Sequence, residues 1–267
     1  MAARPGFARV TLRGMTRGGT HGGLFMARPA SASGKSFNAA SSGIRLPMKV
    51  WDLPTRLFHW LLLVVLVTSY VSVHLADGPH SRFWMNLHLA SGETALGLLL
   101  FRLIWGVLGS ETARFASFLR SPKLALHHLA TLRQKEPDNQ VGHNAAGGWM
   151  VVVMLLLIAV QVGTGLFSND DGSTEGPLAG LVSKATSDLL SRIHDFNINL
   201  LIAAVALHVL AIIVYARLKG HRLLPPMITG KKRLPAATRA PRLAHPLLAW
   251  LAAALAAGVA FAVSRLG

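Results

Sequence analysis

Five long apolar stretches restrict what this chain can fold into more than any other feature of its sequence. A helix needs about 20 consecutive apolar residues to cross the hydrocarbon core of a bilayer. Only 14% of the 267 residues are charged, whereas soluble domains have about 25%. We therefore expect an all-α fold, a transmembrane helical bundle with a four-helix core and a fifth C-terminal span. The expected spans cover approximately residues 58–75, 83–108, 148–167, 192–218 and 246–263.

Positive charges are distributed unevenly among the segments between these spans. The formal net charge of +16 would suggest a nucleic-acid partner in a soluble protein, but no basic face with interleaved aromatic residues occurs, so no nucleic-acid binding is expected. Lys and Arg instead crowd the segment before the first span, the loop after the second and the connection after the fourth. Because basic loops stay on the cytoplasmic side of a bilayer, we predict an N-terminus inside and a C-terminus outside.

Residues 1–47 differ in composition from the rest of the chain. They contain seven Lys or Arg, many Gly and Ser, no acid and no long apolar run. Two interpretations are open, a basic leader resembling an organellar transit peptide or a mis-assigned start with the true initiator at Met48. The second is favoured because a coherent domain begins at Met48, and in both cases the segment should be disordered. We expect a membrane domain over residues 48–233, followed by a linker and the C-terminal helix over residues 234–267.

Four histidines fall within or at the ends of the expected spans. His194 and His208 are 14 residues apart in the fourth span (208 − 194), so they share one helix face and are separated by about 21 Å along the axis. By level, His59 belongs with His208 near the inner side, and His88 belongs with His194 near the outer side. Two opposed imidazoles at each of two levels would hold two haem groups, each with two histidine ligands. The chain has no cysteine, which excludes thiolate ligands and cysteine-held iron–sulfur clusters.

These histidines have two alternative interpretations besides haem ligation. A single histidine at the end of a span is often an interfacial residue, and histidines inside spans can form a proton relay. The joint arrangement favours haem, because it has two levels with two partners each. His80, eight residues before His88, is the main rival ligand in the second span. The histidines of the basic loops are expected to be ordinary surface residues; they are His127, His128, His221 and His245.

Two arginines are candidates for contacts with the inner haem. Arg102 lies 14 residues beyond His88 (102 − 88) and Arg56 lies one turn before His59. A buried arginine needs an anion, and a haem propionate would supply one. The alternative is that Arg102 extends to the membrane surface as an interfacial residue.

Several motifs give the chain a resemblance to a known family. The matching stretches are Val-Trp-Asp-Leu-Pro-Thr-Arg-Leu-Phe-His-Trp at 50–60, Leu-Phe-Arg-Leu-Ile-Trp-Gly at 100–106, Gly-His-Asn-Ala-Ala-Gly-Gly-Trp at 142–149, Thr-Gly-Leu-Phe-Ser-Asn-Asp-Asp at 164–171, residues 193–208 and Pro-Pro-Met-Ile-Thr-Gly-Lys at 225–231. Together they resemble the bacterial cytochrome b561 family, which includes the b-type subunits of nickel–iron hydrogenases. Leu87 before His88 and Glu93 after Gly92 depart from the usual family pattern.

The resemblance implies a four-helix core with two haems b, ligated by His59, His88, His194 and His208. It also implies a bacterial cytoplasmic (inner) membrane and electron transfer between the quinone pool and a redox partner in a respiratory chain. One family branch acts as a quinol oxidoreductase by itself. The other is the cytochrome b anchor subunit of a dehydrogenase or hydrogenase, and a soluble cytochrome is a third kind of partner. A secondary transporter or channel without haem is the alternative from another class; it would need broken helices or a polar pore lining, and the sequence indicates neither.

Overall fold

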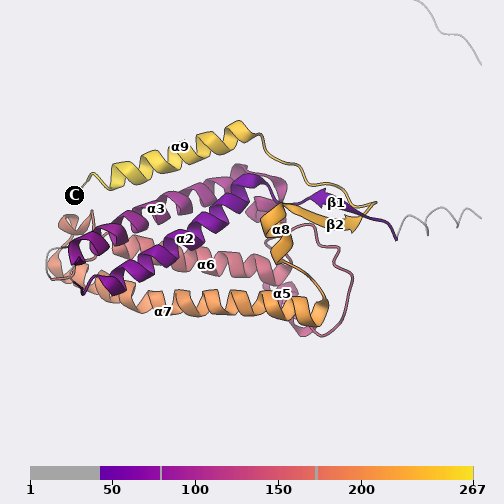
Figure 1. Cartoon of the computed structure of the whole chain (residues 1–267), viewed down its shortest axis with the longest axis horizontal. Coiled ribbons are helices and arrows are strands. Elements are labelled where there is room, and N and C mark those ends of the chain that lie inside the picture. The colour runs from indigo at the N-terminus through magenta and orange to yellow at the C-terminus, as the bar shows by residue number, and fades with distance from the viewer. Residues whose placement is uncertain (1–42, 79, 172–173, 267) are drawn as a thin grey trace, which may run out of the picture.

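The computed structural model describes residues 43–78, 80–171 and 174–266. Within them, five helices are long and apolar enough to span a membrane, and they confirm the five expected spans (Figure 1). Four form the core of the bundle, and the fifth lies on its outside. They are α2 (Leu53–Leu75), α3 (Ser81–Leu108), α6 (Ala145–Gly165), α7 (Lys184–Val214) and α9 (Pro246–Val263). One turn of π-helix, η3 (Tyr215–Lys219), extends α7.

Capping residues set where the core helices begin. The carboxylate of Asp52 accepts a hydrogen bond of 2.8 Å from the backbone N–H of Thr55, so α2 begins five residues before its apolar stretch. Ser183 caps α7 in the same way, and that helix starts at Lys184 rather than near residue 192. Hydropathy marks only the part of a helix that faces lipid, whereas caps decide where its hydrogen bonding starts.

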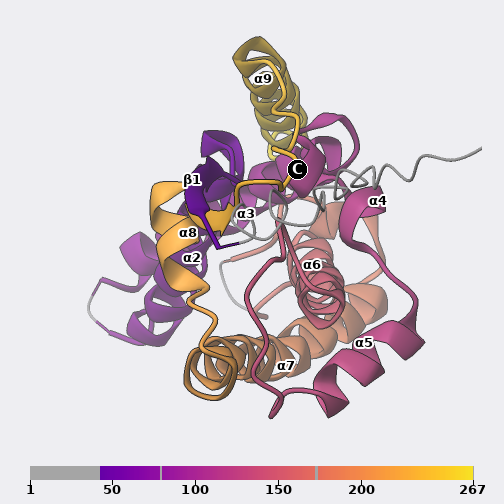
Figure 2. The same cartoon turned by 90° about the vertical axis from the view of Figure 1, so that its right-hand side faces the viewer.

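The four core helices pack as two neighbouring pairs. Helix α2 contacts α3, α6 contacts α7, and α3 joins the pairs by contacting α6; Figure 2 shows this arrangement from one end. Trp105 and Ile158, each only 1% exposed, lie where α3 and α6 meet the rest of the core. The faces of the helices that point away from this core are apolar, as a lipid environment requires.

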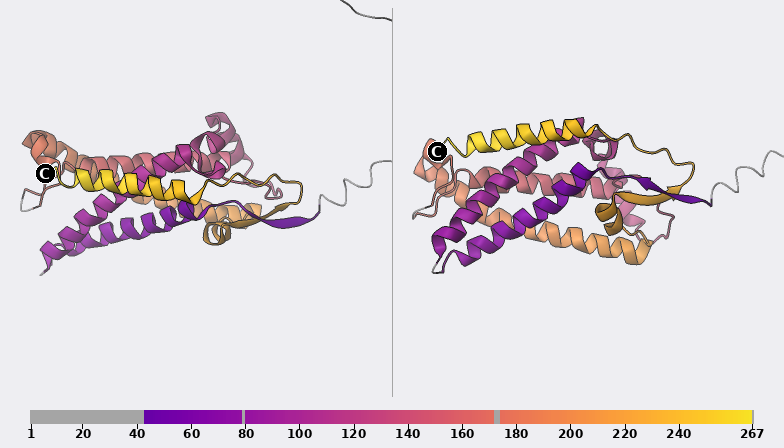
Figure 3. Two further views of the ribbon diagram at one scale, coloured as in Figure 1. Left: turned by 90° about the horizontal axis from the view of Figure 1, so that it is seen from above. Right: turned by 45° about the horizontal axis from the view of Figure 1, so that its top comes forward.

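Helix α9 packs lengthwise against α3, as both views in Figure 3 show. Its buried side is a row of alanines, Ala252, Ala256 and Ala260. A Cβ built on Gly97 of α3 would lie 3.6 Å from the Cβ of Ala260. Small residues let two helix backbones approach closely, so the fifth span is a packed part of the bundle.

The chain leading into α9 is bonded to the end of α3. The backbone N–H of Glu111 donates to the carbonyl of Arg242, and the N–H of Arg242 donates to the Glu111 carboxylate, both at 2.9 Å. The N–H of Ala244 donates to Oγ of Ser110 at 2.9 Å. The Gly-Ser-Glu sequence after the second span therefore fixes where the fifth span starts.

Short elements gather at one end of the bundle, which we call the basic end (Figure 1). The α2–α3 turn, the α6–α7 loop and the last residues of α9 lie at the opposite end. The three segments expected on the cytoplasmic side thus meet at one end of the described structure. The elements of the basic end are β1 (Arg45–Lys49), η1 (Glu111–Ala113), α4 (Phe115–Phe118), α5 (Pro122–Ala130), α8 (Leu224–Thr229) and β2 (Lys231–Pro235).

A two-stranded sheet was not expected from the sequence. Strand β1 pairs antiparallel with β2, with Met48 opposite Lys232. The expected disorder of residues 1–47 is therefore wrong for residues 45–47, which belong to β1, while residues 1–42 lie outside the described part of the chain. Partners nearly two hundred residues away create this strand, and local composition does not reveal them.

The arrangement predicts the topology of the chain in the membrane. A reporter fused after α9 should lie on the outer side of the cytoplasmic membrane, because an odd number of spans separates it from the basic end. Alkaline phosphatase, which is active only outside the cytoplasm, should be active when fused there. Green fluorescent protein at the same position should stay dark, and bright fluorescence would contradict the topology.

A second prediction concerns the boundary of the domain. Guanidinium nitrogens of Arg45 donate to Oδ1 of Asn139 at 3.0 Å and to the carbonyl of Arg233 at 3.0 Å. A chain that starts at Met48 loses these bonds and three of the five residues of β1, so its unfolding midpoint in detergent should fall by roughly 2–5 °C. A chain that lacks residues 1–42 and begins at Gly43, with an initiator methionine added, should keep the midpoint of the full chain. Equal midpoints for both truncations would show that β1 contributes no stability.

Candidate functional site

The structure brings the four histidines together in the two expected pairs. His59 of α2 faces His208 of α7 with ring centroids 6.4 Å apart and ring planes at 52°. His88 of α3 faces His194 of α7 with centroids 6.2 Å apart and planes at 82°. Helix α7 therefore contributes one histidine to each pair, at two levels of the bundle. His80, the rival to His88, is exposed at the start of α3.

The spacing of the rings suits a shared metal ion. Two imidazoles that bind one metal from opposite sides through bonds of about 2 Å have ring centroids roughly 6 Å apart. Both measured separations agree with this value.

Hydrogen bonds orient the rings of His88 and His194, which we call the opposite-end pair because it lies away from the basic end. Nδ1 of His88 donates to the backbone carbonyl of Ser69 at 3.0 Å, and Nδ1 of His194 donates to the carbonyl of Gln161 at 2.9 Å. A carbonyl can only accept, so the proton of each neutral ring is on Nδ1, and Nε2 keeps a free lone pair. Metal-binding histidines are commonly held in this way.

Two polar side chains stabilise this arrangement within the membrane. Nδ2 of Asn197, a residue only 4% exposed, donates to Oε1 of Gln161 at 2.7 Å and to the carbonyl of Leu157 at 2.9 Å. Because polar groups in lipid must find partners within the protein, this contact couples α6 to α7 one turn from His194. Neither residue was predicted from the sequence: Gln161 lies outside the matching motifs, and Asn197 lies inside the stretch 193–208 without a role of its own there.

A cavity of about 550 Å³ surrounds the opposite-end pair and is lined mostly by apolar side chains. This size lies within the usual range for cofactor sites. Two glycines shape it. A Cβ at Gly165 would lie 2.9 Å from Cε1 of His194, so only glycine lets α6 pass beside that ring, whereas a Cβ at Gly92 would meet no atom within 4 Å. The open side of Gly92 faces the cavity.

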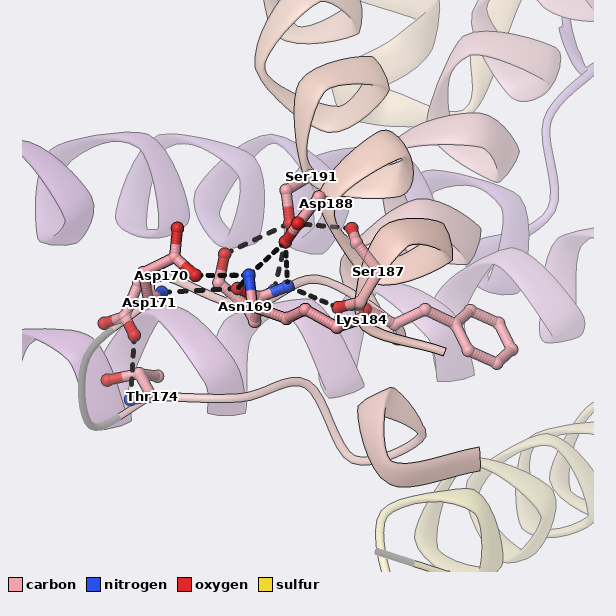
Figure 4. A network of polar contacts seen from close by, with 9 residues as sticks. Asn169, Asp170, Asp171, Thr174, Lys184, Ser187, Asp188 and Ser191 are labelled. Atoms are coloured by element: carbon pink, nitrogen blue, oxygen red, sulfur yellow. Dashed lines mark hydrogen bonds and ion pairs between the residues drawn. The ribbon is translucent and has the colours of Figure 1, made fainter. Parts of the chain in front are cut away.

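The loop between α6 and α7 forms the outer rim of this cavity and is held by a polar network (Figure 4). The side-chain amide of Asn169 donates to Oδ1 of Asp188 at 3.1 Å, and Lys184 pairs with both Asp171 and Asp188. Oγ of Ser191 donates to the carbonyl of Asn169 at 3.1 Å. The network attaches residues 169–171 to the first turns of α7, the helix that carries His194.

Buried polar atoms without hydrogen-bond partners occur at the basic end, where His59 and His208 form the other pair, which we call the basic-end pair. Nδ1 of His59, Nε of Arg56 and Nη1 of Arg102 are buried without a hydrogen-bond partner among the described residues. Arg102 is only 4% exposed, and its guanidinium carbon lies 4.8 Å from the centre of the Phe115 ring. Buried cationic groups with unused donors suit an anionic group of a ligand. Arg102 is therefore buried in the protein and does not reach the membrane surface as an interfacial arginine would.

Arg56 also makes contacts that the sequence did not indicate. Its Nη1 donates to the carbonyl of Ile228 at 2.5 Å, and Nε1 of Trp60 donates to the carbonyl of Met227 at 3.3 Å. A Cβ on Gly230, which has φ +76°, would lie 3.1 Å from Nε of Arg56. The motifs at 50–60 and 225–231 are thus two halves of one contact between α2 and α8.

A buried histidine at the basic end was not predicted from the sequence. The His143 ring lies 4.7 Å from the rings of both Trp51 and Phe118, and its Nδ1 is buried with no partner among the described residues. Burial, with smaller effects from Arg102, His208 and His59, lowers its pKa to about 3. His143 is therefore neutral at physiological pH and lies near the His59–His208 pair. Its only signal was its place in the motif at 142–149.

His128 also differs from the expected surface residue. Its Nε2 is buried, and its ring stacks on Tyr215 with centroids 5.8 Å apart. Burial is the largest cause that lowers its pKa. The residue joins α5 to the end of α7, so its role in the described structure is packing at the basic end.

Helical membrane proteins that hold paired imidazoles at two levels form the class of b-type cytochromes. A family model described as prokaryotic cytochrome b561 matches residues 50–230, and the chain belongs to this family. It is thus a multi-pass membrane b-type cytochrome that transfers electrons, and the family implies haem b as its cofactor. No curated protein and no solved structure matched the chain. Helix α9 lies beyond the matched residues.

Proposed function

We propose that this chain is a dihaem cytochrome b. His59 and His208 would ligate one haem b at the basic end, and His88 and His194 would ligate the other at the opposite end. The observation that supports this most directly is the pair of ring separations, 6.4 Å and 6.2 Å, at two levels of one bundle. The cavity around the second pair and the unpartnered donors around the first pair fit the same group.

The chain's own residues would hold and tune the cofactors. A haem iron carries one electron by alternating between its ferrous and ferric states. Ser69 and Gln161 keep Nε2 of their histidines available, and the apolar cavity walls exclude water. Arg56 and Arg102 would face the propionates of the basic-end haem without ligating its iron. Two centres at two levels of the bundle would let electrons cross the membrane.

We further propose that the electrons pass between the quinone pool and a partner in a respiratory chain of a bacterial cytoplasmic membrane, with the basic end inside. The anchor-subunit alternative uses the same haems and differs only in the partner. A transporter is disfavoured, because the spanning helices of the described residues are continuous through their apolar stretches.

One experiment tests the central proposal. A reduced-minus-oxidised visible spectrum of the purified full chain should show low-spin b-type haem, and a pyridine haemochrome assay should give about two haems per chain. A preparation without haem bands would refute the proposal, and one haem per chain would refute its dihaem form.

Single substitutions of the histidines should identify the pairs. His59→Ala and His208→Ala should each lose the same low-spin haem, and His88→Ala and His194→Ala should each lose the other, because one imidazole leaves the iron five-coordinate or unbound. Redox titration of the four variants measures which midpoint disappears. His80→Ala is the matched control and should keep both haems. A match between His59→Ala and His194→Ala would contradict the pairing.

Arg102 should tune one haem only. Removing a buried cation favours the more positive, oxidised iron, so Arg102→Leu should lower the basic-end midpoint by about 60 mV, a tenfold change for one electron. The other midpoint should stay within about a third of that shift. Arg133→Leu, which removes an exposed cation from the same end, is the control. If Arg102→Leu changed neither midpoint, Arg102 would have no electrostatic effect on a haem.

A further inference from the structure

Helix α3 carries a carboxylic acid in the middle of its membrane span. Glu93 lies 12 residues after the first residue of the helix and 15 before the last (93 − 81 and 108 − 93), which is about 18 Å and 22 Å along the axis. A glutamate side chain is much too short to reach water at either membrane surface over these distances. Ionisable residues at such depth are rare and are usually functional. Because Glu93 departs from the usual family pattern, the properties that the family shares do not account for it.

Glu93 lines the cavity around the opposite-end pair, whose walls are mostly apolar. Its side chain is partly buried, and within residues 43–78, 80–171 and 174–266 it forms no hydrogen bond and no ion pair. A carboxylate in an apolar setting is unfavourable unless a hydrogen-bond donor or a cation compensates its charge. The described residues supply neither, so a proton from solvent is the simplest compensating partner.

Few ionisable groups lie near Glu93. Helices α4, α6 and α9, which pack against α3, contain no ionisable side chain. Of the ionisable residues of α2, Arg56 and His59 belong to the basic end. The cations of α3, Arg82 and Arg102, lie about 16 Å and 14 Å from Glu93 along the axis, and Arg102 is on the opposite face of the helix. The other ionisable side chains of the cavity lining are Tyr70 and His74 of α2, His88 of α3, Asp170 of the α6–α7 loop, and His194 and Asp195 of α7.

We propose that Glu93 is a proton-binding site coupled to the opposite-end pair. Its carboxylate takes up one proton from water when the iron held by His88 and His194 gains one electron, and releases it when the electron leaves. The electron comes from the redox partner of the cytochrome and converts ferric to ferrous iron, while the proton converts the carboxylate to the neutral acid. The net charge around the pair therefore does not change. The inference rests on the proposed function, since it needs a haem at this pair.

The position of Glu93 gives the coupling a physical basis. It lies five residues, about 7.5 Å along the axis, from His88, and charges interact strongly over such a distance where the dielectric constant is low. A negative carboxylate at this place opposes the addition of an electron to the iron, whereas a neutral carboxylic acid does not. The polar rim with Asn169 and Thr174 borders the same cavity, so protons enter from the opposite end. Acidification on that side makes this haem easier to reduce.

Redox titrations at several pH values test the coupling. In the haem-loaded full chain, the midpoint of the opposite-end haem, identified by its loss in His88→Ala, should fall as the pH rises, because protons stabilise the reduced state. Full coupling changes the redox equilibrium tenfold per pH unit, which is 59 mV for one electron. Glu93→Gln keeps the shape of the side chain but binds no proton, so it should lose at least half of the slope, and Glu93→Asp should restore it.

A matched control and three contrary outcomes make the titration decisive. Glu175→Gln removes an exposed carboxylate from the same end, outside the cavity lining, and should keep the slope of the parent protein. In Glu93→Gln, a uniform rise of the midpoint at every pH would show that Glu93 acts only as a fixed charge, and an unchanged midpoint would show that it has no effect on the haem. A slope lost in Asp195→Asn but kept in Glu93→Gln would assign the proton to another carboxylate. Each of these three results overturns the proposal.

Infrared spectroscopy observes the proton itself. The reduced-minus-oxidised infrared spectrum of the full chain should contain the carbonyl stretch of a protonated carboxylic acid that forms on reduction, and Glu93→Gln should lose this band. Haem content separates this inference from the proposed function. If both haems are present and the band persists in Glu93→Gln, the proton site is wrong and the dihaem function stands. If the parent protein lacks haem, the proposed function itself fails and the coupling fails with it.

Discussion

Two histidines 14 residues apart on one helix face the same side only if the helix keeps a regular pitch between them. Helix α7 does so from Lys184 to Val214, and its single turn of π-helix begins after His208. The neighbouring helices are placed accordingly: α2 offers His59 at one level and α3 offers His88 at the other. Hydrogen bonds of His194 and Asn197 to Gln161 connect α7 to α6 at the level of the second pair. The positions of both imidazole pairs depend on the straightness of this one helix.

The features predicted correctly from the sequence are those that depend on helical spacing, namely the apolar spans and the pairing of the histidine rings. Hydropathy located the spans, and the angular spacing of His194 and His208 predicted which rings would meet. The sheet between β1 and β2, the short helices of the basic end and the burial of His143 were not predicted, because each depends on segments that lie far apart in the chain. Helix starts were wrong by up to eight residues at α7, since a cap such as Ser183 has no effect on hydropathy. Whether the paired histidines bind haem stays a prediction.

The cations of the basic end bear on both the orientation of the chain and the packing of its loops. As a group they predict the orientation of the chain in the membrane, and several also form specific bonds. Lys232 pairs with Asp138 at 2.6 Å, and Lys219, whose side chain is fully buried, lies 3.7 Å from a carboxylate oxygen of Glu136. Together with Arg45 they attach the loop before α6 to the sheet and to α7. That loop carries His143, so these contacts also position the residues just before α6.

The packing of α9 against α3 has a consequence for biogenesis. During synthesis α3 leaves the ribosome well over a hundred residues before α9 does. Until then the side of α3 that contains Gly97 lies against lipid, and Ser110 and Glu111 have no linker to bond. The four-helix core can therefore form while translation continues, but α3 gains its packing partner only when the fifth span inserts. A protein arrested before α9 inserts would have both histidine pairs and would lack the helix that packs beside Gly97 of α3.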